Sequence, residues 1–316
     1  MLTHAFGNRQ VSVIGLGSGE FGGTCAESLA RDILDTYTEL GGCFLDTARV
    51  YGDFVTPKNG ESEKVIGRWM TARHCRDRIF LSTKGGHPPL QDMTRSRLSR
   101  EEIRRDMAES LEDLQTDHVD IYWLHRDDPR RDVGEIAETL HSLVEDGSTR
   151  MVGVSNWHPD RILEALRYAR DHGLAEISAN QLQFSLARPL HIADPSLVAM
   201  DADSYRMHME TRMVCCCFSS QARCFLSRLD RLGPDTPESL RRAYESPENL
   251  AILERVRTVR RETGMSVRAI ALSYLTSQPF PTFALVGARS PEQLLDLKEA
   301  GDARLTQAQL DFIRKI

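Results

Sequence analysis

The chain alternates between short apolar runs and segments with helical spacing, and this alternation is its strongest constraint on fold. The first run covers residues 11–15 and the eighth covers residues 283–286. Between successive runs, apolar residues recur three or four positions apart, as Ile103 and Met107 do, which places them on one helical face. Strands that alternate with helices predict a parallel sheet. Eight such strands predict a sheet closed on itself, the (β/α)8 or TIM barrel.

The whole chain, residues 1–316, is expected to form one such barrel as a single domain. Two stretches are longer than a minimal barrel requires: residues 188–212 contain a loop before the seventh strand, and residues 229–279 contain at least two helices. Residues 305–316 have the pattern of an amphipathic helix packed on the outside. Length alone would suggest two domains. However, no linker divides the chain, and single barrels of roughly 250 residues or more are common.

Composition narrows the range of partners. The formal net charge of −6 gives no reason to expect nucleic acid or an anionic membrane. No stretch approaches the ~20 apolar residues of a membrane span, and residues 1–10 lack the apolar core of a signal peptide. We therefore expect a cytoplasmic protein that acts on a small molecule, with its seven cysteines reduced. The oligomeric state stays open.

Three consecutive cysteines, Cys215, Cys216 and Cys217, lie in the strand-like run 213–218. Side chains alternate faces along a strand, so Cys216 would point away from the other two. No CxxC spacing or nearby pair of histidines completes a tetrahedral metal site. Free cysteine is among the most buried residue types, so we expect three small buried side chains and no metal.

Three of the apolar runs end in a chemically reactive side chain. Asp46 ends the second run, Lys84 the third and His125 the fourth, and Tyr51 follows Asp46 by five residues. In a parallel barrel, the carboxyl ends of the strands meet on the face that carries the chemistry. Each residue taken alone could be a capping, surface or packing residue. Their coincidence at successive strand ends predicts an enzyme.

These four side chains suit the reduction of a carbonyl by a nicotinamide cofactor. The cofactor delivers hydride to carbon, and a proton must reach the oxygen. The Tyr51 hydroxyl can donate that proton, because a nearby ammonium such as that of Lys84 stabilises the phenolate that remains. A buried lysine needs an anionic partner, for which Asp46 is suited. His125 can donate a hydrogen bond that positions the carbonyl oxygen. A barrel lysine can also attack a carbonyl covalently, so a Schiff-base lyase is an alternative.

Residues 17–22 match the GxGxxG fingerprint of a Rossmann dinucleotide-binding fold, with Asp46 near the position of a ribose-binding acid. That interpretation would require a second domain, for which the chain shows no boundary. It would also leave the other three reactive residues unexplained. In a barrel, the same residues form the loop after the first strand, where Gly17 and Ser18 would pass close to a bound ligand. We therefore favour the barrel.

The chain resembles the aldo-keto reductase superfamily in segments that span almost its whole length. These segments are residues 42–52, 81–86, 120–125, 153–157, 180–185 and 287–294. The resemblance implies a barrel that binds NADP(H), or alternatively NAD(H), without a Rossmann domain. It also implies a catalytic tetrad of Asp46, Tyr51, Lys84 and His125, with Tyr51 as general acid in reduction and general base in oxidation. Some chains in this superfamily act instead as cofactor-binding regulatory subunits, which is a further alternative.

The same resemblance implies contacts for each part of the cofactor. Ser155, Asn156 and Gln181 would contact the nicotinamide carboxamide, and Phe218 would stack on the nicotinamide ring. The pyrophosphate would lie along Ser219 and Gln221. The adenosine end would be flanked by Gly287, Arg289 and Gln293. Arg289 could pair with a 2′-phosphate because guanidinium matches phosphate geometry, which favours NADP(H).

The chain departs from the family pattern at three places. Residues 219–223 replace a segment that usually carries proline and glycine, so Arg223 is a further candidate for contact with phosphate. Leu297 stands where many members have asparagine near the adenine. Glu20 occupies a first-loop position that is often aromatic in members that reduce carbonyls.

Polar residues follow several strand ends close to the predicted site. They are Glu20, Arg126, Asp127 and Asp128, with Trp157 as the one aromatic. A polar rim of this kind suits a hydroxyl-rich ligand better than an apolar aldehyde, so we expect a sugar, a polyol or a related small carbonyl compound. The alternative is that these residues are solvated loop positions.

Overall fold

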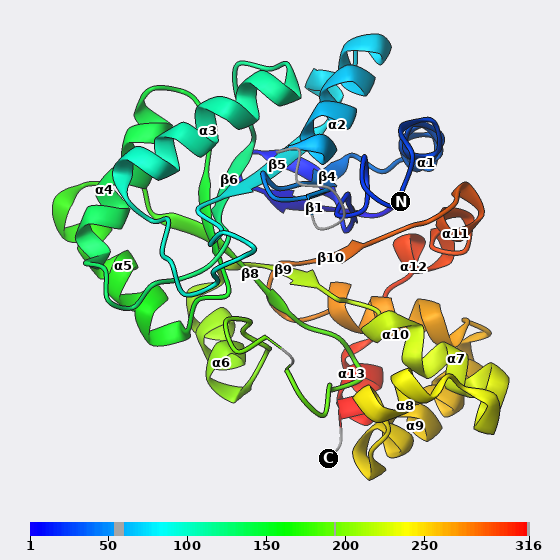
Figure 1. Ribbon diagram of the computed structural model, residues 1–316. Helices are drawn as coiled ribbons and strands as arrows, with labels where there is room; N and C mark the ends of the chain where they lie inside the picture. Colours follow the sequence, from blue (N-terminus) through cyan, green and yellow to red (C-terminus); the bar gives the residue numbers. More distant parts are fainter. Residues whose placement is uncertain (54–59, 193, 315–316) are drawn as a thin grey trace.

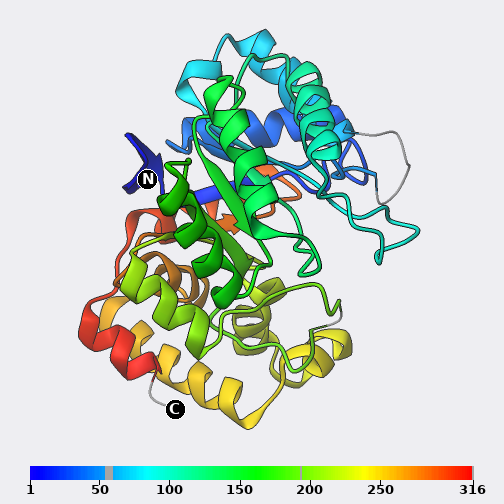
Figure 2. The same cartoon turned by 90° about the vertical axis from the view of Figure 1, so that its left-hand side faces the viewer.

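The computed structural model describes residues 1–53, 60–192 and 194–314, and its centre is a closed barrel of parallel strands (Figures 1 and 2). Neighbouring strands follow the order β10-β3-β4-β5-β6-β7-β8-β9, and every pair is parallel. The strands are β3 (Ile14–Gly17), β4 (Phe44–Asp46), β5 (Phe80–Gly85), β6 (Ile121–Leu124), β7 (Val152–Ser155), β8 (Ile177–Gln183), β9 (Val214–Phe218) and β10 (Thr282–Val286). The predicted (β/α)8 barrel is confirmed.

Helices follow the first five barrel strands and cover the outside of the barrel. They are α1 (Glu27–Glu39), α2 (Glu61–Arg73), α3 (Arg100–Leu114), α4 (Val133–Glu145) and α5 (Pro159–His172). Local sequence explains where α3 begins: the Ser99 side chain accepts a hydrogen bond from Glu102 N and caps the helix. Ile103 and Met107 on α3 are both buried, as their spacing predicts.

The second half of the chain contains more helix than a minimal barrel needs. Residues 188–212 include α6 (Ala202–Thr211), a helix that apolar spacing alone does not indicate; Asp201 caps it by accepting from Ser204 N. The prediction of at least two helices in 229–279 is confirmed. The α-helices between β9 and β10 are α7 (Phe225–Leu232), α8 (Glu238–Tyr244), α9 (Pro247–Thr263) and α10 (Val267–Thr276), with short 3-10 helices at Ala222–Cys224 and Gly233–Asp235.

The last helices pack outside the barrel. The loop after β10 leads to α11 (Pro291–Leu295), α12 (Lys298–Asp302) and α13 (Gln307–Arg314). In both views α7–α9 and α13 gather below the barrel (Figures 1 and 2), and α13 contacts α9. The predicted outer C-terminal helix is therefore confirmed as far as Arg314, and residues 315–316 lie outside the described residues.

An antiparallel hairpin closes the amino end of the barrel. It consists of β1 (Thr3–Phe6) and β2 (Arg9–Ser12). Phe6 is fully buried, and its ring centroid lies 4.7 Å from that of Phe80 and 5.1 Å from that of Phe283, near the starts of β5 and β10. The sequence predicts one strand at residues 11–15, and this prediction is wrong in its bounds, because the run is divided between the hairpin and β3.

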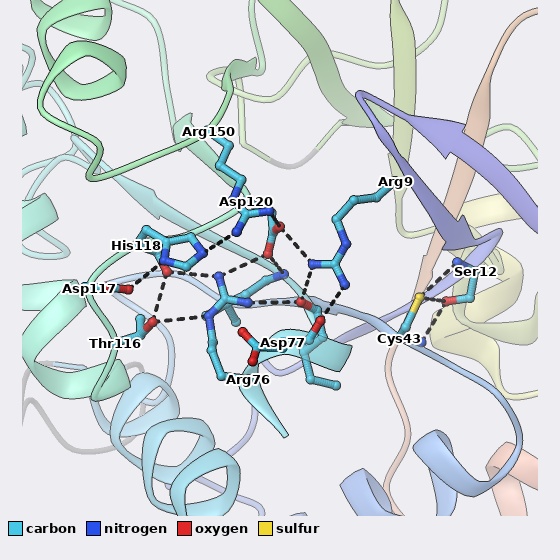
Figure 3. Close-up of polar contacts among 12 residues, drawn as sticks. Arg9, Ser12, Cys43, Arg76, Asp77, Thr116, Asp117, His118, Asp120 and Arg150 are labelled. Carbon is cyan, nitrogen blue, oxygen red and sulfur yellow. Dashed lines mark hydrogen bonds and ion pairs between the residues drawn. The ribbon is translucent and has the colours of Figure 1, made fainter. Parts of the chain in front are cut away.

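Charged residues tie this hairpin to the barrel (Figure 3). Asp120, which directly precedes β6, is buried and accepts from Arg9 Nη1 at 3.0 Å, Arg76 Nη2 at 3.1 Å and Leu81 N at 2.9 Å. Arg150 lies 3.8 Å from the same carboxylate. We call Asp120, Arg9, Arg76 and Arg150 the amino-end cluster. Because Arg9 belongs to β2, the cluster fastens the hairpin across the amino end.

The three consecutive cysteines on β9 are fully buried, as predicted. Cys216 packs inside the barrel with Trp123, whereas Cys215 and Cys217 lie in the apolar layer beneath the helices. In the parts of the chain that the structure describes, no group of three or more His, Cys, Asp or Glu side chains is placed to hold a metal ion. Among the described helices, none is long and apolar enough to cross a membrane.

Candidate active site

Asp46, Tyr51, Lys84 and His125 lie together at the carboxyl end of the barrel. Asp46 ends β4, Lys84 is the penultimate residue of β5, and His125 directly follows β6. The Lys84 side chain is fully buried, and its Nζ donates to Asp46 Oδ2 at 2.6 Å and to Tyr51 Oη at 3.2 Å. The rings of Tyr51 and His125 meet edge to face with centroids 5.7 Å apart. The barrel therefore brings all four side chains into one cluster.

Hydrogen bonds saturate the lysine and its carboxylate partner. Lys84 Nζ makes a third bond, to Thr47 O at 2.8 Å. Asp46 Oδ1 accepts from Ser82 Oγ at 2.7 Å and from Gln181 Nε2 at 3.1 Å. Burial by itself lowers the pKa of Lys84, but nearby negative charge, led by the Asp46 carboxylate, outweighs burial and raises this pKa above its ordinary value. The ammonium therefore stays charged at neutral pH.

The loop that carries Tyr51 is anchored on its outer side. Arg49 Nη1 lies 3.2 Å from a Glu63 carboxylate oxygen and 2.6 Å from one of Asp113, on α2 and α3. Gly52 follows Tyr51 with a φ of +90°, in the left-handed region that favours glycine. Tyr51 itself is half-buried. The loop around Tyr51 is thus held in place, its hydroxyl accepts from Lys84, and its side chain keeps some exposure.

His125 is neutral in this cluster. Burial, followed by the nearby His87, Lys84 and Arg126, lowers the pKa of His125 well below its ordinary value. The backbone N–H of His125 donates to Gly85 O at 2.9 Å, which fixes it beside β5. Its Nδ1 is buried and has no hydrogen-bond partner among the residues that the structure describes. A neutral imidazole can donate one N–H bond to a ligand oxygen.

The side chains expected at a nicotinamide carboxamide lie next to this cluster. Ser155 and Gln181, on β7 and β8, and Asn156, just after β7, are all buried. Asn156 has a left-handed φ of +61°, and its Nδ2 donates to His125 O at 3.2 Å. Phe218, which ends β9, is half-buried. The set is therefore bonded directly to two members of the tetrad, since Gln181 also contacts Asp46.

Gly17 and Ser18 connect the loop after β3 to the end of β4. Gly17 pairs with Asp46 in the barrel register. Ser18 is buried, its backbone N–H donates to Asp46 O at 3.0 Å, and its hydroxyl accepts from Ser62 Oγ at 2.7 Å. The first loop is thus held beside the tetrad.

The segment after β9 has an unusual backbone. Four of its residues have left-handed φ values between 47° and 63°, namely Ser219, Ala222, Arg223 and Cys224. Such values are uncommon for residues other than glycine, and they persist where surrounding structure holds them, often at ligand sites. Here Gln221 Oε1 accepts from Arg268 Nε at 2.7 Å, which ties the segment to α10. The strained turn stands where the family pattern usually has proline and glycine.

The loops after β3 and β10 meet through an ion pair. Arg289 Nε and Nη2 donate to the two carboxylate oxygens of Glu20, at 3.0 and 2.7 Å. The hydrogen bond from Arg289 lowers the pKa of Glu20, so the pair is charged at neutral pH. Arg289 N also donates to Gln293 Oε1 at 2.9 Å. A phosphate at Arg289 would therefore compete with the Glu20 carboxylate.

Two glycines in these loops border open space. A Cβ added to Gly19 or Gly287 would meet nothing within 4 Å, and neither has a positive φ. Neither protein packing nor backbone conformation therefore requires glycine at these positions. Bare backbone beside open space is what close approach by a ligand such as a nucleotide needs.

Most side chains of the predicted polar rim are buried or hydrogen-bonded to other residues of the protein. Trp157 is fully buried, and its Nε1 donates to Arg126 O at 3.3 Å, so the expectation that it lines the rim is wrong. Arg126 is also buried, and its Nε donates to Ser196 Oγ at 2.9 Å in the loop after β8. Asp128 accepts from Arg130 Nε at 2.8 Å. These side chains hold loops in place because each already has a partner within the protein.

Two residues near the site are not indicated by the sequence pattern. His87 lies two residues beyond β5, and its ring centroid is 4.7 Å from that of His125. Arg268 stands on α10 between Gln221 and Asp296, whose carboxylate is 3.5 Å away. The position of His87 just past a reactive strand end is a signal that could have found it. Arg268 has no such signal, because it occupies an ordinary place in an amphipathic helix.

A parallel barrel with a buried cluster of reactive side chains at its carboxyl end is typical of a barrel enzyme. Comparison with known families identifies which one. The model of the aldo/keto reductase family matches residues 13–316, and the chain belongs to this family. It is therefore an oxidoreductase, and members of the family generally use NAD(P)H.

Named relatives cover nearly the whole chain. An aryl-alcohol dehydrogenase of Pestalotiopsis microspora is 27% identical over 309 residues, which are 93% of this chain and 73% of the relative. A putative aryl-alcohol dehydrogenase of Saccharomyces cerevisiae is 30% identical over 311 residues, which are 94% of this chain and 78% of the relative. Norsolorinic acid reductase B of Aspergillus parasiticus is 26% identical over 309 residues, which are 95% and 77% of the two chains.

Proposed function

We propose that this protein is an NADP(H)-dependent oxidoreductase that interconverts a carbonyl compound and an alcohol. The observation that carries the proposal is the buried Lys84 ammonium, 2.6 Å from Asp46 Oδ2 and 3.2 Å from Tyr51 Oη. A tyrosine that gives up its proton needs a cation beside the phenolate. Asp46 supports this role because it keeps the lysine charged despite complete burial.

The proposed mechanism assigns one task to each member of the tetrad. When bound, the nicotinamide supplies or accepts hydride at the substrate carbon. In reduction, Tyr51 donates its phenolic proton to the carbonyl oxygen, and Lys84 stabilises the phenolate left behind. In oxidation, Tyr51 accepts the proton of the alcohol. The neutral His125 donates a hydrogen bond that aligns the substrate oxygen with Tyr51.

The residues around the tetrad fit a nicotinamide nucleotide. The polar side chains proposed to hold the nicotinamide (Ser155, Asn156 and Gln181) are buried, and Asn156 and Gln181 bond to His125 and Asp46; the ring of Phe218, proposed to stack on it, is half-buried. Open space at Gly19 and Gly287 leaves room for the rest of the nucleotide. Arg289 is the candidate for a 2′-phosphate, which would replace the Glu20 carboxylate on its guanidinium. NAD(H) is the alternative cofactor because it would not need this exchange.

For the substrate we propose a sugar, a polyol or a related small carbonyl compound. An aromatic aldehyde or alcohol is the second candidate, because two relatives are named aryl-alcohol dehydrogenases. The polar rim that suggested the first class is largely paired within the protein, so turnover of both classes in one panel decides between them.

The state of Lys84 weighs against a Schiff-base lyase. Covalent attack on a carbonyl needs a neutral amine, whereas Lys84 donates three hydrogen bonds and its pKa is raised. Borohydride trapping of a carbonyl compound on Lys84 would reverse this conclusion. Tight nucleotide binding without turnover over a broad carbonyl panel would favour a regulatory subunit.

The test is a titration with NADPH and with NADH, followed by quenching of intrinsic fluorescence. We expect both the wild type and Tyr51→Phe to bind NADPH more tightly than NADH, because Tyr51 serves the substrate oxygen. Arg289→Met should lose the preference while still binding NADH. Turnover of NADPH with a carbonyl and sugar panel completes the test. Failure to bind either nucleotide would contradict the proposal.

A further inference from the structure

A third ring extends the contact between Tyr51 and His125. The His87 ring meets that of His125 edge to face with centroids 4.7 Å apart, so three rings touch in succession. His87 is 5% exposed. Gly86, with a φ of +68°, turns the chain between β5 and this ring. The proton transfer proposed for Tyr51 and Lys84 makes no use of His87.

Hydrogen bonding fixes which nitrogen of His87 carries its proton. Nδ1 lies 2.6 Å from Pro88 O, and a carbonyl oxygen can only accept, so Nδ1 is the donor. Burial, only partly offset by this bond, lowers the pKa of His87 to about 4, with Arg126 and Arg97 lowering it further and Asp194 opposing them. At neutral pH the ring is therefore uncharged, and Nε2 carries a free lone pair.

This lone pair has no partner within the described structure. In the described parts of the chain, the His87 ring makes one hydrogen bond, that of Nδ1, and Nε2 accepts none. Acceptors on buried side chains are normally hydrogen-bonded, and an acceptor without a partner needs an explanation. The free Nε2 is therefore suited to a donor that arrives with a ligand.

The backbone around His87 is held in a fixed conformation. Arg97 Nη1 donates to His87 O at 3.2 Å, and Gly86 N donates to Asp106 Oδ2 at 2.9 Å. Arg97 and the buried Asp106 are themselves hydrogen-bonded to each other. The ring therefore does not depend on a ligand for its position, which is the condition for selective recognition.

His87 also lines a cavity of about 360 Å³, whose wall includes Val50 and Asp53, close to Tyr51 in the chain. That volume lies within the range of ~300–1,000 Å³ for small-molecule sites. No member of the tetrad lines this cavity, so the His87 ring stands between the cavity and the ring of His125.

We propose that His87 is a specificity-determining residue whose Nε2 accepts a hydrogen bond from a substrate hydroxyl close to the reacting carbonyl. This inference rests on the proposed function and narrows its substrate class to hydroxylated aldehydes and ketones. A plain aliphatic or aromatic aldehyde offers no donor, so on binding it would exclude water from Nε2 without replacing the lost hydrogen bond, and such a loss is costly. Sites built to bond a hydroxyl reject analogues without it for this reason.

The experiment compares glyceraldehyde with propanal, which has the same carbon chain without hydroxyls. The wild type, His87→Phe and His87→Gln are assayed with NADPH for kcat/KM on both aldehydes. Phenylalanine keeps a ring against His125 but has no acceptor, whereas glutamine restores an acceptor oxygen. His87→Leu replaces His87→Phe if the latter does not fold. Fluorescence titration with NADPH checks each variant for an intact cofactor site.

The readout is the ratio of kcat/KM for glyceraldehyde to that for propanal. We expect this ratio to fall by about tenfold in His87→Phe, the loss of one hydrogen bond to a buried acceptor. In His87→Gln it should recover to within about threefold of the wild type. An unchanged ratio in His87→Phe, or an equal loss on both aldehydes, would overturn the inference while leaving the reductase function intact. A wild type that reduces neither aldehyde would also overturn this inference, whereas only failure to bind either nucleotide, or no turnover over the broad carbonyl panel, would overturn the proposed function.

Discussion

Each end of the barrel buries a carboxylate that is paired with positive charge, yet the two ends differ in the number and kind of cations. At the amino end, Asp120 accepts from Arg9, Arg76 and a backbone N–H, and Arg9 reaches it from the hairpin (Figure 3). At the carboxyl end, Asp46 holds a single lysine, which also donates to the hydroxyl of Tyr51. The cations around Asp120 bond to carboxylates, backbone carbonyls and other structural partners. Lys84, beside Asp46, also bonds to the partly exposed Tyr51.

The difference lies in the chemistry of the cations. Guanidinium does not lose its proton in proteins, and its planar fork satisfies a carboxylate and nearby carbonyls together. Arg9 illustrates this, because it also donates to Ile79 O and Asp77 O. Lysine is a compact charge, and here one of its three bonds goes to a hydroxyl that can release a proton. A buried aspartate therefore serves as a clamp at one end and as the support of a proposed proton donor at the other.

The largest effect should come from Tyr51→Phe, which removes the hydroxyl and leaves the ring. We expect kcat/KM for carbonyl reduction to fall by about 10³-fold, within the range for loss of a general acid. Thermal unfolding should change little, because Tyr51 is only half-buried. Steady-state kinetics with NADPH and calorimetry on the same preparation measure both. Near-normal turnover in a folded variant would remove Tyr51 from the mechanism.

Asp120→Asn, unlike Tyr51→Phe, should lower stability and leave activity nearly unchanged. Removing one partner of a buried ion pair costs roughly 3–5 kcal/mol, and here it leaves Arg9 and Arg76 facing a neutral amide. We expect urea unfolding to lose about 3 kcal/mol, while kcat/KM of the folded variant stays within about threefold of the wild type. A folded variant that is as inactive as Tyr51→Phe would break the distinction between the two ends.

The carboxyl end should also be the pH-sensitive end. The pKa of His87 is lowered from 6.5 to about 4, so between these values the unfolded chain binds a proton that the folded protein does not. Protonation of His87 therefore leaves the free energy of unfolding unchanged above pH 6.5. As the pH falls toward 4, it lowers this free energy by roughly 3 kcal/mol. Denaturant unfolding at pH 7 and pH 4.5 should show a larger loss in the wild type than in His87→Phe. Equal losses would mean that His87 is not held neutral.

The smallest effect is expected at the edge of the amino-end cluster. Arg150 has a half-exposed side chain, and its guanidinium is 3.8 Å from Asp120. Arg150→Met should therefore cost less than about 1 kcal/mol of unfolding free energy. Arg9→Met, which also releases the hairpin, serves as the matched comparison and should cost more. If Arg150→Met proved the more damaging in urea titrations, the cluster would depend on its exposed edge rather than its buried centre.

Much of this architecture could be predicted from the sequence. Apolar periodicity locates strands and helices, and the rule that parallel strands share a catalytic face places Asp46, Lys84 and His125 at one end. Tyr51 could be added because it closely follows a strand end. These predictions succeed because they depend on local sequence patterns and on one rule, that the carboxyl ends of parallel barrel strands lie on the same face.

What the sequence did not reveal depends on contacts between distant segments. The Glu20–Arg289 pair joins residues 269 positions apart, and no periodicity encodes it. Trp157 follows a strand end like a rim residue, but its indole is buried against Arg126 O. The division of residues 11–15 follows from Phe6 packing on the starts of distant strands. In each case tertiary packing decides between conformations that the local sequence allows equally.

The central claim is that the Lys84–Tyr51 pair moves the proton while the amino-end cluster only stabilises the fold. The most direct test is a single-turnover experiment in which wild type, Tyr51→Phe and Asp120→Asn, each saturated with NADPH, are mixed with an aldehyde and cofactor oxidation is followed. We predict a rate about 10³-fold lower in Tyr51→Phe and a near wild-type rate in Asp120→Asn. A wild-type rate in Tyr51→Phe, or an equal loss in folded Asp120→Asn, would contradict the account.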